Sequence, residues 1–160
     1  MINLITTSRK PGRNLRKFVR QVCPIFNTKY FVRGKTSVKE LADYLEYEGY
    51  DKLIVVSEFK GNPGSMIFYT SQKGFFKQER KYKITYYKLS EKKMQFPKYE
   101  INLEDKENKD FFKYLGTENE KSEAKIFDEK GIIKIKKGKD VYLSFGVSRS
   151  VEKCLKWGYL

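Results

Sequence analysis

One run of the sequence limits the possible folds more than any other: the four consecutive apolar residues Leu53–Val56, inside the segment Lys52–Phe59. A strand that faces solvent on one side alternates apolar and polar residues, whereas an unbroken apolar run is typical of a strand covered on both faces. We therefore predict a central strand of a parallel sheet. Since helices cover both faces of such a sheet, the expected fold class is α/β.

The segments around this run predict the order β-α-β-α-β-β over residues 1–72. In chain order we expect a strand over Ile2–Thr7, a helix that follows the loop Ser8–Gly12 and ends near Cys23, a strand over Thr28–Val32, a helix between Ser37 and Gly49, the strand Lys52–Phe59, a turn over Lys60–Ser65 and a strand over Met66–Thr70. Right-handed crossovers make the first three strands parallel. The loops that follow these strands then meet at one edge of the sheet, where α/β folds bind ligands.

From residue 74 onward the pattern changes to strands and hairpins, and the polar stretch Ser71–Arg80 predicts a hinge. We expect one domain over residues 1–160, with an N-terminal half of about 1–72 and a strand-rich C-terminal half of about 80–160 that contains two helices. The expected C-terminal elements are strands over Tyr82–Leu89 and Tyr99–Leu103, a helix between Asp105 and Gly116, strands over Ala124–Phe127, Ile132–Lys136 and Val141–Val147, and a short helix over Ser150–Trp157.

Charge is distributed unevenly along the chain. Residues 1–39 contain ten Lys or Arg and no acidic residue, which accounts for most of the net charge of +14. At 100° per residue, the apolar residues between Leu15 and Cys23 share one side of the first helix. The other side, called here the basic helix face, carries Arg13, Arg16, Lys17 and Arg20. Because solvated faces usually mix both signs, this face predicts a bound polyanion, with an ordinary solvated face as the alternative.

The loop Ser8–Gly12 stands immediately before this helix. Its backbone N–H groups, with the side chains of Arg9, Lys10 and Arg13, could receive a phosphate at the helix N-terminus. Simple capping of the helix is the compatible alternative. The glycines of Gly61–Gly64 predict a hairpin turn, whose exposed backbone is a further possible contact with RNA.

Adjacent aromatic residues occur at three places, Tyr30-Phe31, Phe68-Tyr69 and Tyr86-Tyr87. On an open sheet face such rings can stack on unpaired bases. Neighbours on a strand point to opposite faces, however, so at least half of them should lie in the core. We therefore expect core packing for most of these residues.

Several kinds of chemistry have no support in the residue types. The chain has no histidine, the commonest general base and metal ligand. Cys23 and Cys154 are far apart, which fits buried thiols in a reducing compartment, with a disulfide between them as the open alternative. The fragment Gly34–Thr36 lacks the leading glycine of a phosphate-binding P-loop, and the carboxylates within Glu104–Asp110 alternate with lysines as on a solvated helix face. We expect no metal, no cofactor and no enzymatic activity.

No apolar run approaches the roughly 20 residues that a membrane span needs. The first ten residues, MINLITTSRK, lack the charged and then apolar order of a signal peptide. We therefore expect a cytoplasmic protein that does not associate with membranes, and we expect a monomer.

Three motifs resemble the N-terminal half of the Brix-domain family of ribosome-biogenesis proteins, in particular its short archaeal members. They are Thr6–Pro11 followed by Arg13 and Arg16, then Tyr30–Lys35 with Leu41, and Ile54–Val56 running into Lys60–Gly64. Their order and spacing match over about residues 4–70. The C-terminal half departs from the family pattern, because no Leu-Pro-x-Gly-Pro-Thr-like element occurs near Tyr82–Leu89.

The resemblance implies an α/β domain of two similar halves, each related to the anticodon-binding domain of class IIa aminoacyl-tRNA synthetases. It also implies a non-enzymatic factor that binds ribosomal RNA or its precursor during rRNA processing and subunit assembly, with ribosomal or assembly proteins as further partners. The residues that we predict to contact RNA are Ser8, Arg9, Lys10, Arg13, Arg16, Lys17, Arg20, Arg33, Lys35 and Lys60.

Two other classes of function remain open at this point. One is a Mg²⁺-dependent RNA-processing enzyme that uses Glu40, Asp51 or Glu58, although nothing in the sequence groups these carboxylates into a ligand set. The other is a protein-interaction module whose basic face meets an acidic protein of an assembly complex.

Overall fold

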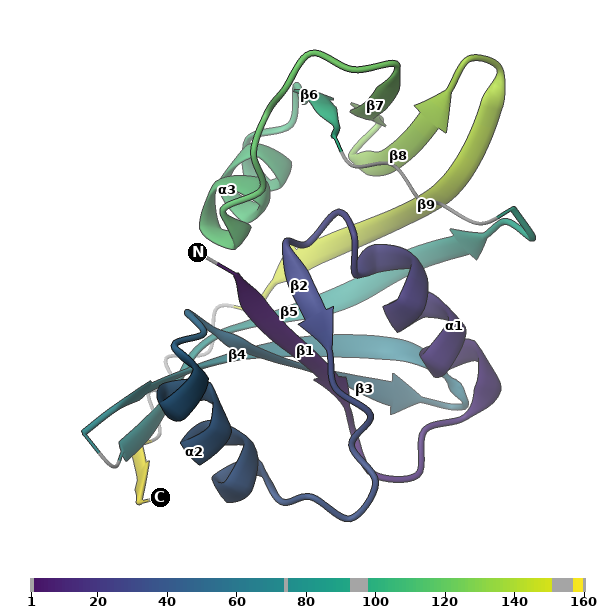
Figure 1. The fold of residues 1–160 in the computed structure, drawn as a ribbon. Helices are drawn as coiled ribbons and strands as arrows, with labels where there is room; N and C mark the ends of the chain where they lie inside the picture. The colour runs from purple at the N-terminus through teal and green to yellow at the C-terminus, as the bar shows by residue number, and fades with distance from the viewer. Residues whose placement is uncertain (1, 74, 93–97, 151–156, 160) are drawn as a thin grey trace.

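A computed structural model describes residues 2–73, 75–92, 98–150 and 157–159, and shows one extended sheet with three helices packed against it (Figure 1). The helices are α1 (Arg13–Val22), α2 (Val38–Glu48) and α3 (Lys106–Leu115). The strands are β1 (Asn3–Thr7), β2 (Thr28–Tyr30), β3 (Leu53–Phe59), β4 (Asn62–Gln72), β5 (Phe75–Leu89), β6 (Glu100–Asn102), β7 (Ala124–Glu129), β8 (Ile132–Lys137), β9 (Asp140–Arg149) and β10 (Trp157–Tyr159).

The strands form a single ten-stranded mixed sheet in the order β2-β1-β3-β4-β5-β9-β8-β7-β6, and β10 pairs separately with β5. β1 is parallel to both β2 and β3, as predicted, so the loops after these three strands leave from the same edge. The remaining pairs on this path are antiparallel except β6 with β7. The α/β class is confirmed.

The unbroken apolar run of β3 is buried on both faces, as its sequence predicted. Ile54 and Val56 belong to the main core, which lies under α1 and α3, whereas Leu53 and Val55 pack with Leu41 and other residues of α2 on the opposite face. Each face of β3 therefore has a helix of its own. α2 and α1 can be followed on opposite sides of β3 in Figure 1.

The predicted hinge over Ser71–Arg80 is wrong. β5 runs unbroken for 15 residues and pairs with β4 in its first part and with β9 in its second. Its polar residues are tolerated because tertiary partners satisfy them: Glu79 accepts a hydrogen bond from the Tyr114 hydroxyl at 2.6 Å, and Arg80 pairs with Asp110 at 2.9 Å. One strand therefore belongs to both parts of the sheet.

The helix boundaries follow the predicted caps. The Ser37 hydroxyl accepts the N–H of Glu40 at 3.1 Å, and Asp105 accepts the N–H of Asn108 at 3.1 Å. Gly49 ends α2 in the left-handed conformation with φ +75°. A helix usually begins at a residue whose side-chain oxygen accepts a backbone N–H of the first turn. It often ends at a glycine.

Three expectations differ from the structure in extent. β2 stops at Tyr30, although the Phe31 N–H is still donated to the Ile5 carbonyl of β1 at 2.8 Å. The turn after β3 is short, since β4 already begins at Asn62 and pairs with Phe59. The helix expected over Ser150–Trp157 falls largely outside the described residues, and its last residue belongs to strand β10. Within the described parts of the chain, no helix is long and apolar enough to cross a membrane.

Candidate nucleic-acid interface

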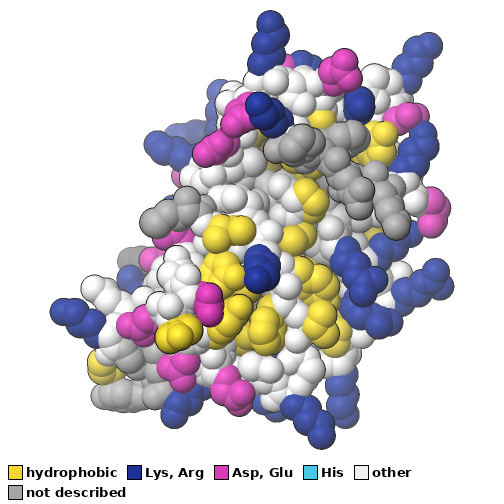
Figure 2. Space-filling model, in the orientation of Figure 1, with side chains coloured by type: hydrophobic (Ala, Val, Ile, Leu, Met, Phe, Trp, Pro, Cys, Tyr) yellow, Lys and Arg dark blue, Asp and Glu magenta, His cyan; other side chains and the backbone are white. Residues whose placement is uncertain are grey.

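The first helix presents the basic helix face outward because its other face is fixed in the main core. The apolar residues of α1 are fully buried. The ring of Phe18 packs edge-on against Tyr87 and Phe145, with centroids 6.1 and 6.2 Å apart. The residues of α1 left exposed on the predicted basic side are Arg13, Arg16 and Arg20. Figure 2 shows Lys and Arg side chains gathered on the side of the molecule where α1 lies.

Lys17 differs from the other members of the basic helix face. Its Nζ lies 2.9 Å from a carboxylate oxygen of Glu91, which follows the end of β5. The hydrogen bond and charge of Lys17, with a smaller effect of Arg13, lower the pKa of the Glu91 carboxyl. The basic helix face therefore has one carboxylate neighbour that comes from another element, which the helix sequence could not reveal.

A second carboxylate occupies the N-terminus of α1. Gly12 is the N-cap of α1 and has no side chain to cap the helix, and its backbone N–H is donated instead to Glu58 Oε1 at the end of β3. A carboxylate at this position is favoured by the helix dipole. A Cβ added to Gly12 would lie 2.8 Å from the same oxygen, so glycine allows the close approach. Capping, the compatible alternative for this loop, is what the structure shows, with the cap supplied by Glu58.

The start of α1 is also tied to the β3–β4 turn. Asn14 Nδ2 donates to Asn62 Oδ1 at 3.1 Å, and the Tyr87 hydroxyl donates to the same oxygen. At the other end of α1, Gln21 Nε2 donates to the carbonyl of Ser90 at 2.7 Å. The exposed arginines are thus carried by a helix that is held at both ends.

Arg33 is buried, unlike the other predicted RNA contacts, with 8% of its surface exposed. Its Nε donates to the Thr36 carbonyl at 2.8 Å, and its Nη1 donates to the Thr7 carbonyl at 3.1 Å. Burial, and secondly the charge of Arg9, lower the pKa of its guanidinium. Arg33 therefore joins the ends of β1 and β2 and positions the loops that carry other cations.

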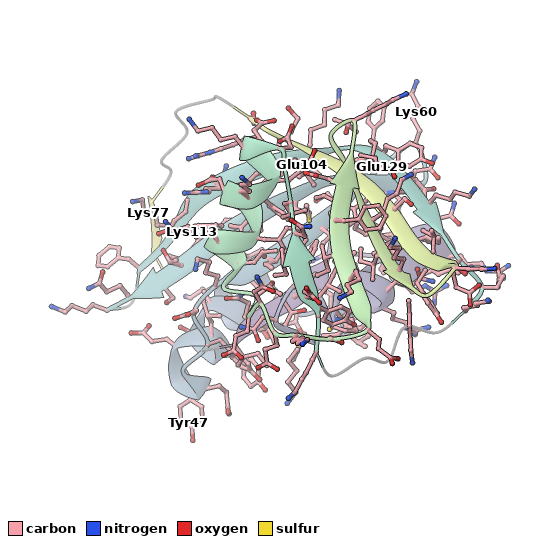
Figure 3. All side chains as sticks on the ribbon, turned by 90° about the horizontal axis from the view of Figure 1, so that it is seen from above. Tyr47, Lys60, Lys77, Glu104, Lys113 and Glu129 are labelled. Atoms are coloured by element: carbon pink, nitrogen blue, oxygen red, sulfur yellow. The ribbon has the colours of Figure 1, made fainter. Side chains whose placement is uncertain are left out.

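The remaining predicted residues lie in the loops at this edge of the sheet. Ser8 is half-buried, and its N–H is donated to the carbonyl of Val56 at 2.9 Å. The exposed cations of the loops are Arg9, Lys10, Lys35 and Lys60. Lys60 lies at the tip of the β3–β4 turn, with its side chain directed into solvent (Figure 3). Among the described carboxylates, none forms an ion pair with these four cations or with the three exposed arginines of α1.

The described residues contain no group of three or more Cys, Asp or Glu placed to hold a metal ion. Glu40, Asp51 and Glu58 are accordingly not gathered into one site. In the acidic stretch around α3, Asp105 caps the helix and Asp110 pairs with Arg80. Cys23 is a free thiol whose burial raises its pKa, and Cys154 lies outside the described residues.

The sequence prediction missed two groups of residues at this edge. The sequence indicates Glu58 only as a candidate Mg²⁺ ligand, since nothing local shows that a carboxylate will cap a helix 46 residues away in the chain. Lys81 and Lys83 were missed as well, although they alternate with the buried Tyr82 and Ile84 of β5. That period of two is the signal for a lysine-bearing sheet face.

No family model matches the chain. Over 68 residues it is 41% identical to a curated protein of Archaeoglobus fulgidus and 40% identical to one of Methanococcoides burtonii, both named "Probable Brix domain-containing ribosomal biogenesis protein". The match covers 42% of this chain and 41% or 42% of those relatives. The similarity therefore spans about two fifths of their length.

Two solved structures resemble nearly the whole chain. One is a probable ribosomal biogenesis protein from Aeropyrum pernix K1, with a TM-score of 0.68, 21% identity and coverage of 94% of this chain and 97% of that one. The other is Mil, an archaeal Imp4-like protein, with a TM-score of 0.72, 20% identity and coverage of 93% and 99%. At these identities the likeness concerns the fold. The predicted resemblance to the Brix-domain family is confirmed, since curated relatives of this chain are named Brix domain-containing ribosomal biogenesis proteins and its fold matches archaeal ribosome-biogenesis and Imp4-like proteins.

Proposed function

We propose that this protein is a non-enzymatic factor of ribosome biogenesis that binds ribosomal RNA or its precursor. The observation that carries the proposal is a set of seven exposed cations on α1 and the loops beside it, which have no ion-pair partner among the described carboxylates. This set, called here the α1 edge, consists of Arg9, Lys10, Arg13, Arg16, Arg20, Lys35 and Lys60. Seven like charges on one edge repel one another until an anion arrives. The names of the relatives place those proteins in ribosome biogenesis, which makes ribosomal RNA the polyanion we propose.

In this proposal α1 and the adjacent loops contact phosphates. Arg13, Arg16 and Arg20 approach the backbone of a structured RNA from the helix, and the loop cations Arg9, Lys10, Lys35 and Lys60 extend the contact along the edge. At the N-terminus of α1 the Gly12 N–H is already donated to Glu58 and is therefore not free to bind a phosphate. Sequence preference comes from unpaired bases, since an A-form helix hides its base edges in a deep and narrow groove.

We also propose that the sheet is built from two similar halves related to the anticodon-binding domain of class IIa aminoacyl-tRNA synthetases. The pairing order supports this proposal. Along β1-β3-β4-β5 the pairs are parallel, antiparallel and antiparallel, and the same sequence of pairs occurs along β6-β7-β8-β9. β5 and β9, the last strands of each set, pair with each other.

Crosslinking the protein to RNA in cells, followed by sequencing of the attached fragments, tests the proposal. We expect enrichment of ribosomal RNA or its precursor, lost when Arg13, Arg16 and Arg20 are replaced by Gln. Association with a protein partner that survives RNase treatment, without RNA enrichment, would favour the protein-interaction module instead. Cleavage of a labelled precursor fragment that needs Mg²⁺ and is abolished by EDTA would contradict the non-enzymatic part of the proposal.

A further inference from the structure

A groove with a volume of about 670 Å³ lies where the β3–β4 turn diverges from β5. The pairing of β4 with β5 ends at Ser65 and Lys83, after which β5 continues beside β9. The residues that give the groove its chemistry are Phe59, Lys60, Lys81, Lys83 and Tyr86. Its volume is within the roughly 300–1,000 Å³ typical of sites for small organic molecules, a class that includes a nucleotide.

Three aromatic residues line the groove, and the backbone keeps two of them, Phe59 and Tyr86, out of the core. Tyr87 packs against Phe18 in the main core, so the adjacent Tyr86 points to the opposite face of β5. The register of β5 and β9 shifts between Ile84 and Tyr86. On the other wall, a Cβ at Gly64 would lie 2.6 Å from the Cβ of Phe59, so glycine is required for the turn to bring Phe59 to this position.

The two rings are unusually exposed for large hydrophobic residues. Phe59 is 66% exposed and Tyr86 is 43% exposed. Lys60 Nζ lies 5.4 Å from the centre of the Phe59 ring, and Lys81 and Lys83 extend from the same face of β5. The groove therefore combines flat apolar surfaces with positive charges next to them.

One carboxylate lines the groove, and its hydrogen bond is made outside the set of groove lysines. It belongs to Glu58, whose Oε1 accepts the N–H of Gly12 at the start of α1. Among the described residues, no carboxylate pairs with Lys60, Lys81 or Lys83. The groove is also adjacent to the proposed interface, because Lys60 belongs to both.

We infer that this groove binds an unpaired segment of the same RNA that the basic helix face contacts, an inference that rests on the proposed function. Bases stack on Phe59 and Tyr86, and the phosphates between them lie against Lys60, Lys81 and Lys83. Aromatic stacking and lysine contacts are the two elements of single-strand recognition. A duplex does not offer base faces for stacking, so the groove selects RNA that is single-stranded at this point.

The test uses the full chain, a fluorescent oligouridylate of about ten nucleotides and a duplex RNA of equal length. We expect Tyr86→Ala and Phe59→Ala each to weaken oligouridylate binding about tenfold, and to change duplex binding less than about twofold. Tyr86→Phe retains the ring and should bind like the wild type. Unchanged melting temperatures of the variants show that the fold is intact.

Three outcomes would overturn the inference. If Tyr86→Ala and Phe59→Ala leave oligouridylate binding unchanged while Arg16→Gln with Arg20→Gln weakens it, the groove is not the contact and the proposed function survives. If the wild type binds neither RNA, the proposed function fails and the groove proposal fails with it. If a polyglutamate peptide displaces oligouridylate as effectively as an unlabelled RNA of equal charge does, the groove recognises negative charge alone. Its partner is then better explained as an acidic protein.

Discussion

Residues 2–89 and residues 98–150 contribute strand pairs in the same order to one sheet, yet the two regions differ in what surrounds those strands. In the first region, β3 has α1 on one face and α2 on the other. In the second region, α3 packs on the main core, and no described helix covers the opposite face. The same pairing order is therefore compatible with very different surfaces.

The two regions also differ in how their charges are compensated. In the second region and the segment just before it, lysines pair with nearby carboxylates. These ion pairs are Lys92–Asp140, Lys98–Glu120, Lys125–Glu100, Lys134–Glu129 and Lys137–Glu123. Among the described residues up to Gln72, the ion pair of Lys17 with Glu91 is the only one. Both regions are rich in lysine or arginine, and they differ in how many of these cations have a carboxylate partner among the described residues.

The largest effect is expected where the two regions share a core. Phe18 of α1 contacts Phe145 of β9 and is fully buried, so Phe18→Ala should reduce the free energy of unfolding by about 3–5 kcal/mol. Urea denaturation measures the change, and Tyr47→Ala serves as the control, since Tyr47 is 87% exposed on α2 and points away from the body (Figure 3). Amide exchange in β1 and β8 should rise together. Separate unfolding of the two strands would show that the regions are independent units.

The next effect concerns the buried cation of the first region. Arg33→Ala removes the donors to the Thr7 and Thr36 carbonyls and should cost about 2 kcal/mol of unfolding free energy. Lys35→Ala, an exposed cation two residues away, should change stability by less than about 0.5 kcal/mol. Both variants are compared by thermal and urea denaturation. Equal small effects would mean that Arg33 is a surface cation like its neighbours.

In the second region a carboxylate has the comparable structural role. Asp128 accepts the N–H groups of Glu104 and Asp105 at 2.9 and 3.0 Å and the Asn108 side chain at 3.0 Å. Burial opposes its charge, but these donors outweigh burial and lower the pKa of Asp128. Its contribution to stability is therefore present above the unfolded pKa of about 3.9 and is lost as the pH falls through the lower folded pKa.

Asp128→Asn should reduce the unfolding free energy by about 1 kcal/mol at neutral pH. The difference from the wild type should shrink as the pH falls below about 4, because the unfolded wild type then binds a proton that the folded carboxyl takes up only at lower pH. Urea denaturation over a range of pH measures it. A difference that stays constant down to the lowest pH would show that the charge of Asp128 has no role.

The smallest effect is expected at the ion pair that links α1 to the end of β5. Glu91→Gln removes the carboxylate next to Lys17 and should tighten binding of ribosomal RNA about twofold. Because Glu91 is almost fully exposed, stability should not change measurably. Glu120→Gln, which breaks an ion pair in the second region, is the matched control and should leave RNA affinity unchanged. A gain of equal size in both variants would point to a general effect of net charge.

The fold could be predicted wherever local sequence decides it. The structure confirms three kinds of local signal: the apolar run of β3, the caps Ser37 and Asp105, and the glycines after α2 and α3. The continuity of β5 could not be predicted, because its polar residues look like a hinge until Tyr114 and Asp110 are brought to them by α3. Long-range partners decide such segments.

The candidate site was predictable to the same degree. The exposure of Arg13, Arg16 and Arg20 follows from helical periodicity. The burial of Arg33 and the capping by Glu58 do not, since both depend on atoms that only the assembled sheet brings near. RNA contact by the ten predicted residues stays a prediction, and the structure favours a positioning role for Arg33.

The contrast between compensated and uncompensated cations is tested most directly by the salt dependence of RNA binding in two matched variants. One replaces the uncompensated Arg13, Arg16 and Arg20 of α1 by Gln. The other replaces Lys92, Lys98 and Lys137 by Gln, which pair with Asp140, Glu120 and Glu123, so that each variant loses three exposed cations. Affinity for a ribosomal RNA fragment is measured over a range of salt concentrations. We expect the α1 variant to flatten the logarithmic salt slope by about two units, and the variant of the three paired lysines to retain the wild-type slope. Equal slopes in the two variants would contradict the assignment of RNA binding to the α1 edge.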